Sequence, residues 1–387
     1  MAGKQFETIS TKQKRLYLAT YIIVSLCISL YFYSKPAYNW DILPYMAIIS
    51  AGDKTNSKEI HDKVYSTAKQ EIPPLYYERL IDSNHAYRRL MKEDALAFQS
   101  QLPFYVVKPL YTYSCLLFYK MGFSLSRATV MPSVICFFLL SLVVFYWLQK
   151  YASPLFAFIT GALLMLSAPV ISTASLSTPD ALSALLLFLS IYCIVEKRSI
   201  AGTVAFSILA IFARLDNIIP ALSFVLLFSF TKGLLPKIGL PYSLTILALI
   251  ILSYLLISNN ATQYGWNLLY YPSFIKKLSL PGAIADHFSA KNYWQVFKSQ
   301  FFTGLYYSHV WVLILFALIL LFVPTGFIMA ELSIDQLLVL LFLILIVIRF
   351  ILQPVAADRF YTAYYLSAAI FLFRKKAMLC QQQIDGR

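Results

Sequence analysis

The chain has 387 residues, of which 59% are apolar and only 13% are charged, and its mean hydropathy is +0.68. Soluble domains carry about 25% charged residues, so this composition excludes a soluble globular enzyme. The 30 phenylalanines and 28 tyrosines also exclude a disordered chain. The net charge of +14 does not indicate nucleic-acid binding here, because basic residues also mark the cytoplasmic side of membrane proteins.

Ten apolar stretches are long enough, or nearly long enough, to cross a bilayer as helices, which takes about 20 residues. They are residues 16–33, 128–148, 155–171, 181–195, 200–213, 217–231, 241–258, 306–323, 335–352 and 360–373. The first stretch lacks a small-residue cleavage site, so we expect it to be retained as a span and not removed as a signal peptide. The sequence predicts an all-α integral membrane protein forming a single polytopic domain over residues 1–387.

The basic residues predict the orientation of these spans. With the N-terminus in the cytoplasm, nearly every short segment on that side is basic. The segments carry Lys12, Lys14 and Arg15, then Lys150, then Lys197 and Arg198, then Lys232 and Lys237, and finally Arg374, Lys375 and Lys376. Both termini are thus expected in the cytoplasm, and two large loops, 34–127 and 259–305, on the opposite side. The loops are nevertheless short for a eukaryotic protein, which favours a bacterial inner membrane with the site on its periplasmic side. The alternative is a eukaryotic membrane with the site on its luminal side.

Residues 103–121 are apolar and aromatic, and Lys108-Pro109 interrupts them. This composition is typical of a helix lying in the membrane interface, with tyrosine rings at the headgroups and lysine reaching water. The alternative is a true span. A span here would move Lys150 and the Lys197–Arg198 turn to the outer side, so we favour the interfacial helix.

Eight ionisable residues are predicted at the outer ends of the spans, where burial near hydrocarbon is costly and suggests function. They are Asp41, Lys108, Arg127, Asp180, Arg214, Asp216, Asp358 and Arg359. Structural roles remain as alternatives. Asp180 suits a helix cap, and Arg214 with Asp216 suits a local ion pair. Asp358 and Arg359 suit an outer anchor pair.

Several common sites are not indicated. The five cysteines are scattered, and no histidine or cysteine spacing typical of zinc occurs. Glycine-rich nucleotide loops and the serine-hydrolase motif are absent from the sequence as well. The sequence requires no cofactor, although a divalent cation remains open.

The order of these features resembles the GT-C superfamily of polytopic glycosyltransferases, which includes protein O-mannosyltransferases and the lipid A aminoarabinose transferase. The resemblance rests on Asp41 after the first span, on Lys108-Pro-Leu-Tyr followed by Gly122, Arg127 and Pro132-Ser, on Ser167-Ala-Pro followed by Asp180, and on Asp358-Arg-Phe-Tyr. Departures are Ile42, where the family often has a second acid, the missing second proline after Lys108, and the lack of a soluble C-terminal domain.

The resemblance implies a sugar donor linked to polyprenyl phosphate and a lipid, glycan or protein acceptor. Displacement at the sugar carbon needs a base for the acceptor hydroxyl and cations for the departing phosphate. We therefore assign Asp41 as the general base, Lys108 and Arg359 as phosphate ligands and Arg127 as a supporting cation. Asp180 is assigned as a carboxylate that either supports the residues in contact with substrate or orients the acceptor, with Arg214, Asp216 and Asp358 in support. A single displacement predicts inversion.

Two other classes remain open at this stage. A flippase for a lipid-linked sugar would bind the same lipid without breaking a bond. An O-antigen-type polymerase or ligase would transfer sugar from a diphosphate-linked donor.

Overall fold

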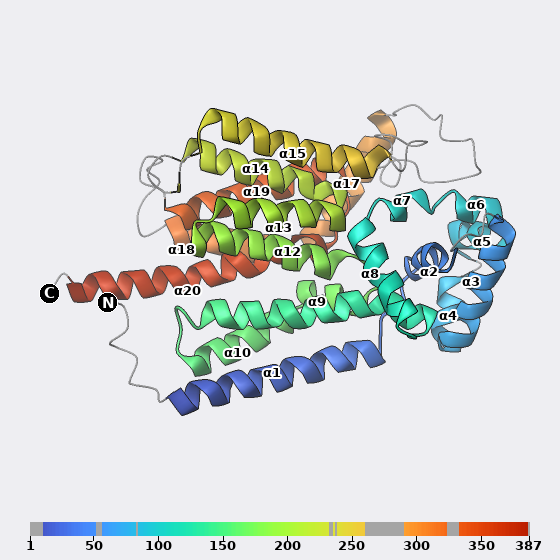
Figure 1. Ribbon diagram of the computed structural model, residues 1–387, viewed down its shortest axis with the longest axis horizontal. Helices are drawn as coiled ribbons and strands as arrows, with labels where there is room; N and C mark the ends of the chain where they lie inside the picture. Colours follow the sequence, from blue (N-terminus) through green and yellow to red (C-terminus); the bar gives the residue numbers. More distant parts are fainter. Residues whose placement is uncertain are drawn as a thin grey trace.

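The computed structural model describes residues 11–51, 56–82, 84–231, 235–236, 238–259, 290–322 and 333–385. These residues fold into helices and contain no strand (Figure 1). The helices are α1 (Thr11–Ser34), α2 (Ile42–Ala51), α3 (Ser57–Glu71), α4 (Pro74–Leu80), α5 (Ala86–Glu93), α6 (Ala95–Gln99), α7 (Pro103–Val106), α8 (Pro109–Lys120), α9 (Leu125–Leu148), α10 (Pro154–Met165), α11 (Ala168–Ser175), α12 (Asp180–Tyr192), α13 (Ile200–Ala213), α14 (Ile218–Phe230), α15 (Leu240–Asn259), α17 (Ala290–Tyr307), α18 (Val310–Phe322), α19 (Ile334–Leu352) and α20 (Thr362–Asp385). The all-α prediction is confirmed for this part of the chain.

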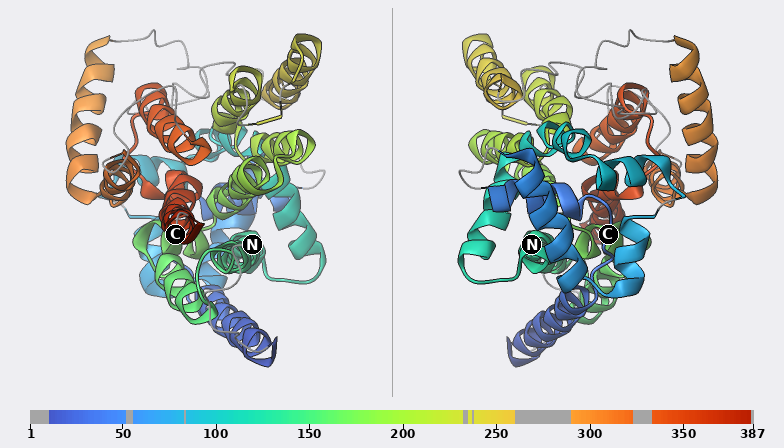
Figure 2. Two further views of the ribbon diagram at one scale, coloured as in Figure 1. Left: turned by 90° about the vertical axis from the view of Figure 1, so that its left-hand side faces the viewer. Right: turned by 90° about the vertical axis from the view of Figure 1, so that its right-hand side faces the viewer.

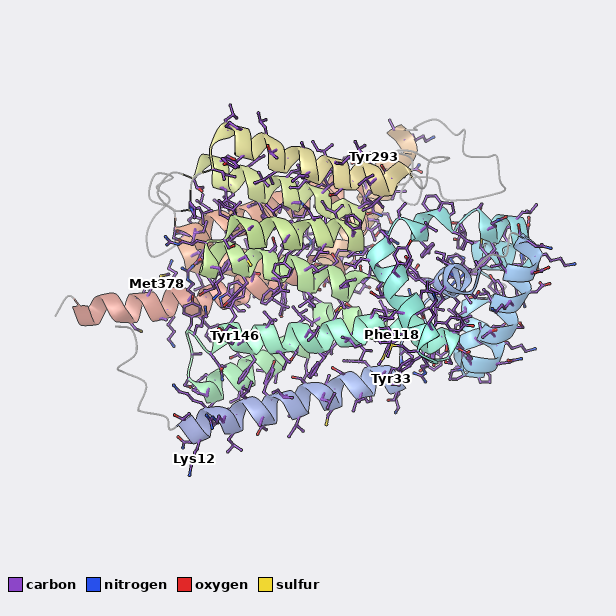
Figure 3. The ribbon with its side chains drawn as sticks, in the orientation of Figure 1. Lys12, Tyr33, Phe118, Tyr146, Tyr293 and Met378 are labelled. Atoms are coloured by element: carbon purple, nitrogen blue, oxygen red, sulfur yellow. The ribbon has the colours of Figure 1, made fainter. Side chains whose placement is uncertain are left out.

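Long helices run side by side along the molecule and form a bundle, while the short helices α2 to α7, here called the cap, gather at one end (Figure 1). The start of α1 and the end of α20 lie at the other end. Figure 3 shows the same polarity in α1, since Lys12 lies at the end away from the cap and Tyr33 lies beside it. Figure 2 shows α17 running across the direction of the bundle helices.

Four helices are long and apolar enough to cross a membrane, namely α1, α9, α15 and α19. Two bent pairs also qualify if each is one span: α10 with α11, bent by 64°, and residues 293–307 with α18, bent by 67°. The described chain therefore has four to six candidate spans, which is consistent with a membrane protein. Each of the ten predicted ranges contains a helix, but several of these helices are short, so the number ten stays a prediction.

The single interfacial helix predicted over residues 103–121 is instead two helices, α7 and α8. The break falls at Lys108, whose backbone is non-helical, because the following Pro109 disfavours helical geometry in the residue before it. Helix α8 has 12 residues, or about 18 Å, which is short of the roughly 30 Å of hydrocarbon. The interfacial location itself remains a prediction.

Among the described residues, Lys12 and the turns that carry Lys150 and Lys197 lie at the bundle end away from the cap. Helix α9 starts beside the cap and reaches this far end at Leu148, and Lys150 follows it (Figure 1). The Lys150 ammonium forms an ion pair of 2.7 Å with Glu196, which brings the turn after α12 to the same end. This placement agrees with the predicted one-sided distribution of basic residues.

The cap has its own apolar core, and it is attached to the bundle at a defined point. Side chains such as Tyr45, Met46 and Phe98 are completely or almost completely buried in it. The Glu71 carboxylate accepts hydrogen bonds from the backbone N–H groups of Leu125, at 3.1 Å, and Ser126, at 2.7 Å. An acid at a helix N-terminus satisfies unpaired N–H groups and opposes the helix dipole. Glu71 thus fixes α3 of the cap to the start of α9.

Candidate functional site

A cavity of about 230 Å³ lies where the cap meets the ends of α12, α13 and α19. Its walls come from segments far apart in the sequence. The lining residues are Asp41, Tyr45, Phe104, Tyr105, Val107, Lys108, Thr178, Pro179, Asp180, Arg214, Leu215, Asp216, Gln353, Arg359 and Phe360. Six of the eight predicted site residues therefore share one cavity.

Asp180 begins α12, and its side chain is buried and fully engaged. One carboxylate oxygen accepts a hydrogen bond from Arg214, and the other accepts one from the Thr178 hydroxyl at 2.8 Å. The second oxygen also lies 2.9 Å from Nε of Arg359. The Asp180 carboxylate therefore orients two arginines, which suits a positioning role better than proton transfer.

Arg214 and Asp216 form the local ion pair that the sequence allowed, but they belong to a larger network. The chain is extended at Arg214, which ends α13, and the guanidinium donates two hydrogen bonds of 3.0 Å to Asp216. Arg349, on α19, donates a third to the same carboxylate at 2.8 Å. Burial alone raises the pKa of Asp216, but the two arginines outweigh it and hold the pKa well below its usual range.

Arg349 is the member of this network that the sequence analysis missed. It lies inside the predicted span 335–352, and its side chain is buried. The ring of Phe360 stacks against the guanidiniums of Arg349 and Arg214. Its centroid lies 3.9 Å from the guanidinium carbon of Arg349 and 4.3 Å from that carbon of Arg214. The signal was available, since an arginine within an apolar run is costly and suggests a partner.

Asp41 reaches the cavity from the cap side, between the end of α1 and the start of α2. The Tyr105 hydroxyl donates a hydrogen bond of 2.8 Å to one oxygen, and Asn39 donates to the other. No lysine or arginine within the described residues lies at ion-pair distance from this carboxylate. Asp41 is therefore oriented by neutral donors and stays open to the cavity.

Lys108 lies at the break between α7 and α8, and its ammonium faces aromatic rings. The nitrogen is 4.7 Å from the ring centroid of Tyr105 and 5.8 Å from that of Tyr45. No carboxylate lies at ion-pair distance from it in the described chain. Burial, reinforced by the charge of Arg214, lowers the pKa of Lys108 to about 8, although Asp41 acts in the opposite direction.

Arg359 follows α19 in a 3₁₀ turn, Asp358–Tyr361, and its side chain is 27% exposed. Its Nε atom lies 2.9 Å from Asp180 in an ion pair that lacks hydrogen-bond geometry, and its two terminal nitrogens make no hydrogen bond to other described residues. A guanidinium fixed at one nitrogen and open at two is suited to a bidentate contact with an anion.

Two of the predicted site residues lie outside this cavity. Arg127 donates hydrogen bonds to the backbone carbonyls of Tyr33 and Ser34 and stacks on the Tyr33 ring, so it links the end of α1 to the start of α9. Asp358 accepts hydrogen bonds from the Ser308 hydroxyl and from the His309 N–H at the start of α18. Asp358 lines a separate cavity of about 290 Å³.

The predicted outer loop 259–305 falls largely outside the described residues, because only Asn259 and residues 290–305 of it are described. In the described chain, no group of three or more histidine, cysteine or carboxylate side chains is arranged to hold a metal ion. Comparisons with family models, curated proteins and solved structures find no match to this chain.

The arrangement divides the charges of the site into two kinds. The arginines 214, 349 and 359 share the two carboxylates of Asp180 and Asp216, so these charges hold one another in place. Asp41 and Lys108 have no charged partner at contact distance within the described residues. The cavity therefore presents one free carboxylate, one free ammonium and the open end of Arg359 to a ligand.

Proposed function

We propose that this chain is a membrane glycosyltransferase that moves a sugar from a polyprenyl-phosphate donor to an acceptor hydroxyl. The observation that carries the proposal is the placement of Asp41, Lys108 and Arg359 around one cavity, with atoms free to contact a ligand. A base and two cations are what displacement at a phosphate-bearing sugar carbon requires. The resemblance of the sequence to GT-C enzymes points to the same chemistry.

In the proposed reaction, the acceptor oxygen attacks the anomeric carbon of the donor sugar. A new carbon–oxygen bond forms, and the bond from that carbon to the phosphate oxygen breaks with its electron pair. The acceptor proton moves to Asp41. The phosphate monoester leaves as an anion without an acid catalyst, since its second pKa is near ~6. One displacement inverts the configuration of the sugar carbon.

The two cations hold the phosphate in this scheme. The ammonium of Lys108 and the terminal nitrogens of Arg359 contact its oxygens and stabilise the charge that develops as the bond breaks. The buried network of Asp180, Arg214, Asp216 and Arg349 keeps Arg359 in position. No step in the scheme requires a metal ion. We place the reaction on the extracytoplasmic side of a bacterial inner membrane, because the cap lies opposite the basic turns.

The decisive experiment uses purified, reconstituted full-length chain with radiolabelled polyprenyl-phosphate hexose and a membrane extract as acceptor. Transfer of label is expected for the natural chain. Asp41→Asn should lower turnover by about 10²- to 10⁴-fold, because general-base catalysis is lost. Asp62→Asn is the matched control, since this carboxylate lies in the cap on an exposed side chain outside the cavity. Normal turnover by a folded Asp41→Asn chain would contradict the base assignment.

The same experiment separates the two alternative classes. A flippase moves label across a vesicle without transferring it. Transporter charges are expected near the middle of the membrane, whereas these lie at the cap end of the bundle. An O-antigen-type enzyme uses a diphosphate-linked sugar, so parallel assays with monophosphate and diphosphate donors distinguish it.

A further inference from the structure

The second cavity, of about 290 Å³, has no part in the reaction described above. It shares Arg359 with the first cavity and is otherwise lined by α11, by the end of α17, by the turn between α17 and α18 and by the segment before α20. Its polar lining consists of Ser172, Thr303, Tyr307, Ser308, His309 and Asp358 besides Arg359. The two cavities are therefore neighbours with a common arginine.

Hydrogen bonds within the chain already use the donors of three hydroxyls in this second cavity. Ser172 donates to the Pro169 carbonyl at 2.9 Å, Thr303 donates to the Ser299 carbonyl at 2.9 Å, and Ser308 donates to Asp358. A hydroxyl has one hydrogen to donate and two lone pairs. These three side chains therefore offer a ligand mainly acceptor positions.

Asp358 also offers hydrogen-bond acceptor positions to a ligand in the second cavity. Its two oxygens accept hydrogen bonds from Ser308 and from the His309 N–H, and a carboxylate has about four acceptor positions. The second cavity thus adds hydroxyl and carboxylate acceptors to the guanidinium of Arg359, whereas the first combines Arg359 with a second cation, Lys108. A phosphate group needs donors, so it matches the first cavity. A group with many hydroxyl hydrogens matches the second.

We propose that the second cavity binds the acceptor, and that the bound group is a neutral carbohydrate or a similar polyol. The inference rests on the proposed transferase function and narrows its acceptor from lipid, glycan or protein to a hydroxyl-rich glycan group. Arg359 adjoins both cavities, so we expect a glycan held here to extend one hydroxyl into the first cavity, toward Asp41 and the face of the sugar carbon opposite the phosphate. The Asp358 carboxylate in its wall disfavours a second anion.

The first test concerns the chemistry of the acceptor. Membranes containing the full-length chain are extracted, and the extract is treated with periodate, which cleaves vicinal diols, and then quenched. Fresh purified chain and radiolabelled polyprenyl-phosphate hexose are added. Transfer is expected to fall at least tenfold relative to a mock-treated extract. Undiminished transfer after diol cleavage overturns the proposal, because the acceptor then lacks the vicinal diols of the expected glycan.

The second test concerns the location. Thr303→Phe places a ring in the second cavity, and Leu305→Phe is its control, because residue 305 is 60% exposed on α17 and does not line the cavity. Two amounts of label are measured: the label transferred to acceptors in the extract, and the label released when water hydrolyses the donor. The first amount is divided by the second. We expect at least a tenfold lower ratio for Thr303→Phe and an unchanged ratio for Leu305→Phe.

The outcomes separate this inference from the function on which it rests. If the natural chain neither transfers nor releases label, the transferase function fails and the acceptor site falls with it. If the natural chain transfers label and Thr303→Phe keeps the natural ratio, the function stands and the location is wrong. A folded Thr303→Phe chain with a lowered ratio supports the second cavity as the acceptor site.

Discussion

The two sides of the first cavity handle charge in opposite ways. On the bundle side, Asp180 and Asp216 are each shared between two arginines. On the cap side, Asp41 and Lys108 face neutral aromatic and amide groups. Charges that satisfy one another contribute rigidity, whereas charges that lack partners are available to a ligand. The difference predicts a structural role for the paired charges of the bundle side, apart from the open end of Arg359, and a role in ligand binding for the charges of the cap side.

Substitution of a paired charge on the bundle side should have the largest effect on the stability of the chain. Arg214→Ala removes a guanidinium that contacts both buried carboxylates and leaves them short of positive charge. Breaking a buried pair in this way costs about 3–5 kcal/mol. We expect a large loss of stability together with loss of activity, measured as the midpoint of thermal unfolding in detergent. Arg79→Ala, at an exposed cap position, serves as the control. A stable but inactive Arg214→Ala chain would show that the network is functional and not structural.

Substitution of a charge on the cap side should lower the activity of the chain without lowering its stability. Lys108→Ala is expected to lower turnover by about 10²- to 10³-fold, as removal of an electrostatic donor commonly does. The fold should tolerate the change, because no carboxylate in the described chain pairs with this ammonium. Turnover and unfolding midpoint are measured on the same preparation. A large drop in the midpoint would place Lys108 with the structural charges.

The pH dependence sharpens this assignment. Lys108 carries its charge below a pKa of about 8 and loses it as the pH rises through that value. Donor affinity should therefore fall by up to tenfold per pH unit above about 8. Lys108→Arg keeps its charge throughout, so its KM for the donor should stay level over the same range. Parallel profiles for the natural and arginine forms would show that another group titrates.

The smallest effect is expected where the two regions meet. Glu71→Gln weakens the contact that caps α9 and attaches the cap. The expected loss is about 1 kcal/mol, typical of a helix cap, with a modest change in KM as the cap shifts against the bundle. Glu78→Gln, an exposed acid on α4, is the control. An unchanged midpoint for Glu71→Gln would mean that apolar packing alone holds the cap.

The positions of most helices were predictable from local sequence. Each predicted apolar range contains a helix, because every backbone polar group in an apolar segment must be satisfied within the segment itself. The break at Lys108 was marked by Pro109, but its consequence was underestimated, so one helix was predicted where two occur. Proline acts on the residue before it as well as on its own position.

The candidate site was predictable only in part. Selecting charged residues near span ends found Asp41, Lys108, Asp180 and Arg359, which do line one cavity. The same rule also selected Arg127, whose guanidinium binds backbone carbonyls of α1 instead. It missed Arg349, because that residue falls inside the predicted apolar range 335–352, although it lies in the last turn of α19. Position along the chain does not tell which neighbour a side chain will meet.

The sequence by itself determined the helices and their one-sided basic turns, since apolar length and charge act locally along the chain. It also determined which few ionisable groups lie near apolar spans and therefore need a polar or charged neighbour. Only the tertiary structure decided which of these groups neutralise one another and which stay free. That choice depends on contacts of a few ångströms between segments that lie far apart in the sequence. Residues 41 and 108 come close to residue 214 where the cap docks on the bundle, and residue 349 meets residue 216 within the bundle itself.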